Sequence, residues 1–123
     1  MKIKRLFILG AVFLLAGCAK KEYGTRIGVA DYTKISLLKD NPGNYIGLPV
    51  KVNGKVIEES TRGSWITIQE KDKNKSYVIY VNFDDRPDIT LKNLKDRMVS
   101  VEGRFVQTRE GYFIKGVWCK VLD

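Results

Sequence analysis

The side chains that most often carry out chemistry are sparse in this chain of 123 residues. It has no histidine, so the commonest general base and the commonest transition-metal ligand are absent. Acidic residues occur as the neighbours Glu58 and Glu59, as Asp84 and Asp85, or singly near turns. Adjacent residues of a strand point to opposite faces, so these carboxylates are interpreted as solvated charges. The sequence predicts no catalytic residue, no metal site and no cofactor.

Two cysteines remain as reactive candidates. Cys119 alternates with Val117 and Val121, which favours a small buried side chain, and a reactive or intermolecular thiol is the alternative. Cys18 stands instead behind a basic start, an apolar segment and the small residues Ala16 and Gly17. The surroundings of the two cysteines in the sequence differ, and each predicts a different role.

Residues 1–17 resemble a bacterial lipoprotein signal peptide. The alternative is an uncleaved membrane anchor, but the apolar segment, residues 6–15, is shorter than the roughly 20 residues of a spanning helix. The resemblance implies that residues 1–17 are removed and that the Cys18 thiol carries a diacylglycerol, which excludes a disulfide with Cys119. It implies a lipid-anchored protein of the bacterial cell envelope. Because Ala19 follows Cys18, it implies the outer membrane, facing the periplasm, if the cell is Gram-negative.

Behind the signal segment we expect a lipidated tether at residues 18–30 and one domain at residues 31–123. A short helix is predicted from Asp31, as N-cap, to Asp40. Alternation with a period of two predicts strands at about residues 49–58, 65–69, 77–83, 99–105 and 112–122, with a bulge or a sharp bend at Gly54 and a bend at Gly116. A second short helix is expected at residues 90–95.

This order of elements predicts an all-β protein, a five-stranded OB-fold Greek-key barrel with one short helix before it and another between strands 3 and 4. A barrel of the SH3 type is the alternative, without that second helix. Residues 44–47 followed by the alternating run at 50–56 resemble the opening of bacterial OB-fold lipoproteins, whose domain is similar to the anticodon-binding barrel of tRNA-binding proteins. The positions expected inside the barrel are Val50, Val52, Ile66, Ile68, Ile79, Val81, Val99, Val101 and Phe105.

The outward positions of strands 2 and 3 form the face on which OB-folds bind ligands. An aromatic side chain there can stack on a base or a sugar, and basic residues attract phosphate. The predicted ligand-binding residues are Trp65, Thr67, Gln69, Tyr80 and Asn82 on that face, Lys51 and Lys55 on strand 1, and Arg62 and Arg109 in the rim loops. Alternatively, Trp65 packs beneath the N-terminal helix with Leu37 and Leu38, and the other residues are ordinary sheet surface.

The formal net charge of +8 suits an anionic partner but does not identify one. We expect a binding or interaction module without catalytic activity, attached to a membrane through the lipid on Cys18. Its partner would be an envelope protein, a glycan or a small charged ligand. The alternative is an envelope protein that binds single-stranded oligonucleotides on strands 2 and 3, although a protein outside the cytoplasm rarely meets nucleic acid. A haem-handling OB protein is excluded because its covalent attachment depends on histidine.

Overall fold

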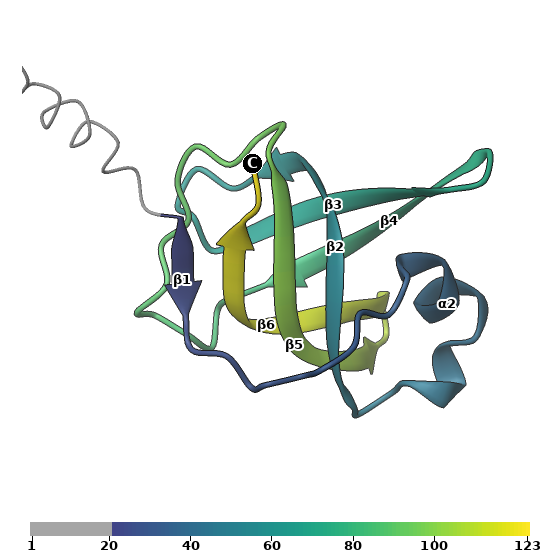
Figure 1. Cartoon of the computed structure of the whole chain (residues 1–123). Coiled ribbons are helices and arrows are strands. Elements are labelled where there is room, and N and C mark those ends of the chain that lie inside the picture. The colour runs from purple at the N-terminus through teal and green to yellow at the C-terminus, as the bar shows by residue number, and fades with distance from the viewer. Residues whose placement is uncertain (1–20) are drawn as a thin grey trace, which may run out of the picture.

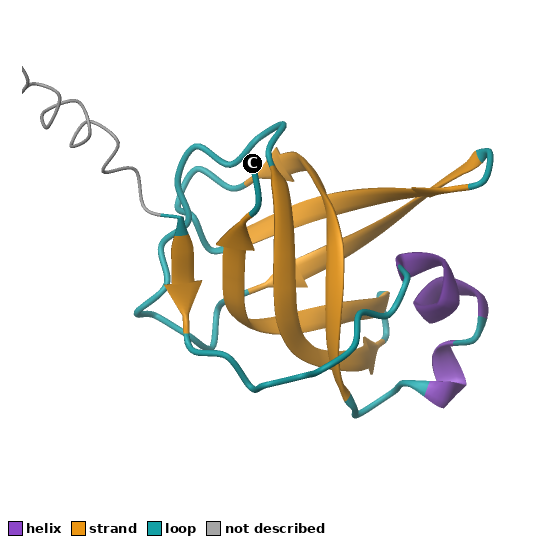
Figure 2. Cartoon of the chain, viewed as in Figure 1, coloured by secondary structure: helices purple, strands orange, loops and turns teal. Residues whose placement is uncertain are grey.

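Five long strands dominate the computed structural model, which describes residues 21–123 (Figures 1 and 2). The predicted signal peptide and Cys18 lie outside the described residues. The long strands are β2 (Pro49–Glu59), β3 (Trp65–Asp72), β4 (Lys75–Asn82), β5 (Met98–Thr108) and β6 (Gly111–Val121). All five predicted strands are confirmed, because alternation between a buried and an exposed face is a local property of the sequence.

The strands close into a barrel, since β5 pairs with β2 on one side and with β6 on the other. The order β6-β4-β3-β2-β5 is antiparallel throughout, apart from the parallel pair of β4 and β6. All nine residues expected inside the barrel are at most 2% exposed. The sequence therefore predicted both the strands and the face that each strand buries.

Two glycine predictions have different outcomes. The ladder between β5 and β6 shifts register beside Gly103 and Gly116, and a Cβ on Gly116 would overlap the Phe83 ring, so the irregularity expected near Gly116 is confirmed. Of the bulge or sharp bend expected at Gly54, the bulge is wrong, because β2 shifts register between Val56 and Glu58 instead. Gly54 serves a close approach: a Cβ there would lie 2.9 Å from the carbonyl oxygen of Gln69.

The N-terminal helix is shorter than predicted. Helix α2 spans Ile35–Asp40 with Lys34 as N-cap, and the 3-10 helix η2 (Pro42–Asn44) follows it. Asp31 is not the N-cap, because Lys34 itself still has an extended backbone and the Thr33 N–H donates to the Lys51 carbonyl at 2.8 Å. Ile35 and Leu38 of α2 are fully buried in the barrel core.

The helix predicted at residues 90–95 is absent; β4 and β5 are joined there by turns and irregular chain. Leu91 and Leu94, three residues apart, are both buried. Their N–H groups, however, donate to the Gly63 carbonyl and to the Glu59 carboxylate, respectively. Asn93 adopts a φ of 56°, which a helix does not allow. Bonds to distant segments replaced the local helical bonds.

A short strand lies within the segment interpreted as a tether. Strand β1 (Glu22–Gly24) pairs antiparallel with β6, and Tyr23 is buried in the core. The following residues, 25–33, form a segment that we name the strap; it runs across the outside of the barrel to α2 (Figure 1). Residues 22–24 of the segment interpreted as a tether therefore belong to the barrel sheet, and the sequence did not indicate this because β1 is recognisable only through its pairing with a strand almost a hundred residues away.

Candidate ligand-binding face

Three aromatic rings line up across the outer face of neighbouring strands. Trp65 on β3 and Tyr80 on β4 have ring centroids 5.6 Å apart, and Tyr80 and Phe113 on β6 are 5.8 Å apart. We name these residues the aromatic ladder. Tyr80 is 37% exposed, and the rings at either side are half-buried. The ladder confirms that Trp65 and Tyr80 share one outward face.

Phe113 was missing from the predicted face. The signal was present, because Ile114 points into the barrel and its neighbour must then point outward. The sequence did not indicate that β6 lies beside β4, which depends on how the barrel closes.

Polar residues fix the central ring. Thr67 is the cross-strand partner of Tyr80, and Asn82 lies opposite Trp65. The Asn82 side-chain amide donates to the Tyr80 hydroxyl at 2.8 Å, while Asn82 Oδ1 accepts the N–H of Asp84 at 2.7 Å. Thr67 and Asn82 therefore lie on the same outward face as Tyr80, and Asn82 orients the Tyr80 ring.

Two grooves flank Tyr80. The first has a volume of about 640 Å³ and is lined by Glu59, Ser60, Thr61, Arg62, Ser64, Trp65, Tyr80 and Asp84. The second, of about 480 Å³, is lined by Tyr80, Thr108, Glu110, Gly111, Tyr112 and Phe113. Arg62 thus lies where it was predicted, and the exposed Arg109 lies in the turn between Thr108 and Glu110. Carboxylates as well as basic groups line these grooves, so the surface is not uniformly positive.

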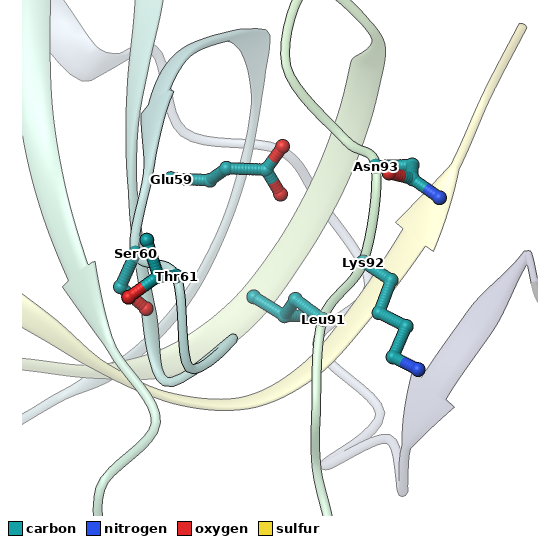
Figure 3. Close-up of a pocket in the computed structure, with 6 residues that line it drawn as sticks. All are labelled: Glu59, Ser60, Thr61, Leu91, Lys92 and Asn93. Atoms are coloured by element: carbon teal, nitrogen blue, oxygen red, sulfur yellow. The ribbon is translucent and has the colours of Figure 1, made fainter.

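A third hollow, of about 340 Å³, adjoins the first through Glu59, Ser60 and Thr61 (Figure 3). Glu59 and Leu91 point into it from opposite sides, and Lys92 points away from it. The Glu59 carboxylate accepts the N–H groups of Leu94 and Lys95 at 3.2 and 3.1 Å. Glu59 therefore holds residues 94–95 of the loop between β4 and β5 in place.

Three of the predicted residues lie elsewhere. Lys55 and Gln69 are cross-strand partners in a separate hollow with Met98. Lys51 is only 8% exposed, and its Nζ lies 4.6 Å from the centroid of the Tyr32 ring. The prediction that Lys51 belongs to the ligand-binding face is wrong, because the strap covers this part of β2.

The alternative position for Trp65 is also not found. Helix α2 is attached at the opposite end of β3, where the Ile35 N–H donates to Glu70 at 2.6 Å and the Ser36 hydroxyl donates to Asp72 at 2.8 Å. The ring of Trp65 contacts Tyr80 instead of the helix. Leu38 is buried in the core, and Leu37 is exposed.

The opposite outer face of the barrel is occupied by the chain itself. Glu102 is fully buried beneath the strap, and its carboxylate accepts hydrogen bonds from the Arg26 guanidinium, with the shortest at 2.6 Å, and from the N–H groups of Ile27, Gly28 and Val29. We name this arrangement the Glu102 latch. Burial by itself raises the pKa of Glu102, but the bonds from Arg26 and from the N–H groups of Gly28 and Ile27 outweigh burial and lower the pKa.

Trp118 belongs to the same covered face. Its Nε1 donates to Glu22 at 2.7 Å, and the Arg26 guanidinium lies 5.1 Å from the centroid of its ring. Sequence reasoning missed Glu102, Arg26 and Trp118. The alternation of β5 indicated that Glu102 points outward, but it carried no information about what lies on top.

The remaining chemistry is limited. Cys119 is a free, fully buried thiol, as expected, and burial raises its pKa to about 12, so it is not a thiolate at neutral pH. Among residues 21–123, no cluster of His, Cys, Asp and Glu side chains is suited to hold a metal ion. Within the same residues, no helix has the length and apolar character needed to cross a membrane.

No protein-family model matches the sequence, and no curated protein matches it. Solved structures do match. The hypothetical protein ygiW from E. coli aligns with a TM-score of 0.55 at 14% identity, over 76% of this chain and 91% of that chain. A protein described as an aspartyl-tRNA synthetase from Leishmania major Friedlin aligns with a TM-score of 0.55 at 12% identity, over 79% of this chain and 21% of that chain. At these identities the likeness concerns the fold, and it supports an OB-like barrel.

Proposed function

We propose that this protein is a lipid-anchored binding module of the bacterial cell envelope, built on an OB-fold and without catalytic activity. The observation that carries the proposal is the aromatic ladder, with Tyr80 exposed between two grooves. Ring faces held at fixed spacing suit stacking on a flat ligand group, and nearby hydroxyl and amide groups suit hydrogen bonding to it. The ligand would be an envelope protein, a glycan or a small charged molecule.

The OB-fold assignment depends on the sheet and not on the helices. The helix expected between strands 3 and 4 is replaced by irregular chain. The closed order of the five long strands and the parallel pair of β4 and β6 support the assignment, as does the likeness to solved structures.

A non-catalytic role is supported by the hydrogen bonds of the two carboxylates that line the first groove. Glu59 is bonded to two backbone N–H groups, and Asp84 accepts a bond from the Asn82 amide at 3.1 Å. Neither lies in an arrangement with a nucleophile and a base. The lipid anchor on Cys18 and the envelope location are proposed from the sequence of residues 1–18.

Crosslinking in living cells tests the binding module. A photo-reactive amino acid at Phe113, on the ladder, is compared with the same group at Asn74, in the turn between β3 and β4. We expect a defined crosslinked product only from position 113, and its loss when Trp65→Ala and Tyr80→Ala are combined. The same products from both positions, or none from position 113, would contradict binding at the ladder.

The second candidate is an oligonucleotide-binding protein, favoured by the ring spacing of the ladder and by Arg62 beside it. Residues 19–123 are titrated with a fluorescent dT12 oligonucleotide at two salt concentrations. This candidate predicts an affinity that falls with salt and falls at least about tenfold in the Trp65→Ala, Tyr80→Ala variant. Affinity that is absent, or unaffected by either change, rules it out.

A further inference from the structure

We propose that the barrel docks directly on the phospholipid surface that holds its anchor, through one pole of the barrel. We name this surface the anchor pole, and its members are Lys21, Lys92, Lys95, Met98, Lys120 and Leu122. The proposal rests on the lipid anchor at Cys18 proposed above. It states in addition that the folded domain contacts the bilayer in a defined orientation.

The chain between the anchor and the barrel is short. Three residues separate Cys18 from Glu22, the first residue of β1. Four residue steps span at most about 14 Å when fully extended. The headgroup layer on one side of a bilayer is about 5 to 8 Å thick. The start of β1 therefore lies close above the headgroups, whatever conformation the connecting residues adopt.

The chain that follows, residues 21–29, is held against the barrel by hydrogen bonds. Residues 22–24 pair with β6, and the Val121 N–H donates to the Lys21 carbonyl at 2.7 Å. The Glu102 latch then holds residues 26–29 against β5. Because β1 cannot lift away without breaking these bonds, its distance from the anchor limits how far the end of β6 and the start of β5 can lie from the bilayer, and the surface chemistry of the barrel then decides its orientation.

The anchor pole exposes two apolar side chains. Met98 and Leu122 are 39% and 46% exposed, and the Leu122 N–H donates to the Met98 carbonyl at 2.8 Å, so the two side chains belong to adjacent positions. Exposed apolar side chains at a bilayer surface can enter the boundary between headgroups and acyl chains.

The charged groups around these two residues are consistent with a phospholipid partner. Lys21, Lys92, Lys95 and Lys120 are exposed, and none of them forms an ion pair with the described residues. Most carboxylates nearby are already engaged: Glu22 by Trp118, Glu59 by backbone N–H groups and Asp123 by Arg97. Glu58 and Asp96 remain exposed beside them. The free lysines are available to headgroup phosphates.

Site-directed spin labelling tests the docking on the full-length lipidated chain. Met98→Cys at the anchor pole is compared with Asn74→Cys, which lies at the tip of the hairpin that points away from β1 (Figure 1). The label reacts with the introduced cysteine alone, because Cys18 is acylated and Cys119 is buried with a pKa of about 12. The protein is reconstituted into vesicles of phosphatidylethanolamine and phosphatidylglycerol.

We expect the label at position 98 to be at least about threefold less accessible to a water-soluble nickel chelate than the label at position 74, as for a group at the headgroup boundary. Lys92→Glu combined with Lys120→Glu is expected to remove most of this difference. The control variant, Lys73→Glu combined with Lys75→Glu on the hairpin, is expected to preserve the difference in accessibility. Equal accessibility of the two labels in the chain with all its lysines intact would overturn the docking. A difference that survives the charge reversal of Lys92 and Lys120 would also overturn it.

Failure of the anchor is distinguished from failure of the docking. The mass of the purified protein shows whether an acyl-modified Cys18 is present, and Cys18→Ser shows whether membrane partitioning depends on it. Absence of the modification overturns the proposed anchor and the docking with it. A modified protein whose label at position 98 is as accessible as that at position 74 overturns the docking alone.

Discussion

The two tryptophans of this barrel lie on different outer faces and have opposite surroundings. Trp118 is 4% exposed, bonded to Glu22 and covered by Arg26 of the strap. Trp65 is half-buried, contacts Tyr80 and borders an open groove. Both side chains point away from the barrel interior. An outward position is therefore not the same as an accessible one, and only the face that no other segment covers is available to a ligand.

One outer face is covered and the other is open mainly because of the Glu102 carboxylate. On the covered face, Glu102 collects hydrogen bonds from four strap residues and so ties the N-terminal chain to β5. On the open face, the polar residues bond to near neighbours, such as Asn82 to Tyr80 and Asp84, and leave the ring surfaces uncovered. The comparison predicts that the covered face contributes to stability and the open face to binding.

Replacement of Glu102, the carboxylate of the latch, is expected to have the largest effect on the free energy of unfolding. Glu102→Ala should lower the free energy of unfolding by about 2 to 3 kcal/mol, because several hydrogen bonds to a charged acceptor are lost together. Urea denaturation followed by circular dichroism measures the change. Thr67→Ala on the open face is the matched control and should cost less than about 1 kcal/mol. Equal losses in the two variants would mean that the strap contributes nothing particular to stability.

Acidification should weaken the same latch, with a smaller effect than removal of the side chain. The pKa of Glu102 is lowered in the folded state, so its contribution to stability is complete above the ordinary glutamate pKa of 4.5 and is lost as the pH falls through the lower folded value. The pKa values of Asp72 and Asp123 are also lowered, so the wild type alone does not isolate this effect. Unfolding curves from pH 7 to pH 3 should therefore be compared with those of Glu102→Gln, which should lose less stability on acidification. Parallel curves would contradict the role of Glu102.

The smallest expected effects come from replacing each tryptophan by phenylalanine. Trp118→Phe removes the hydrogen bond to Glu22 and should cost about 1 kcal/mol, whereas Trp65→Phe should change the free energy of unfolding by less than about 0.5 kcal/mol. In the Trp65→Phe variant the remaining fluorescence comes from Trp118 and should resist quenching by acrylamide. In the Trp118→Phe variant it comes from Trp65 and should be quenched. Similar quenching in both would remove the distinction between the faces.

The local periodicity of the sequence was sufficient for the barrel strands and for the inward positions such as Val52 and Ile68. It was also sufficient to place Trp65, Thr67, Tyr80 and Asn82 on one outward face. It was misleading where a helix and an irregular loop have the same spacing of apolar residues. Leu91 and Leu94 have helical spacing, yet their N–H groups bond to Gly63 and Glu59 from distant segments, and no helix forms.

The sequence by itself determined which side of each strand is apolar and hence that the chain closes around one core, since alternation depends only on neighbouring residues. Tertiary structure alone decided that residues 22–33 lie on the barrel, that Lys51 is covered and that Phe113 joins Trp65 and Tyr80. The physical reason is the distance along the chain. Glu102 meets its partners across more than seventy residues, and no local pattern encodes which distant segment a side chain will bind.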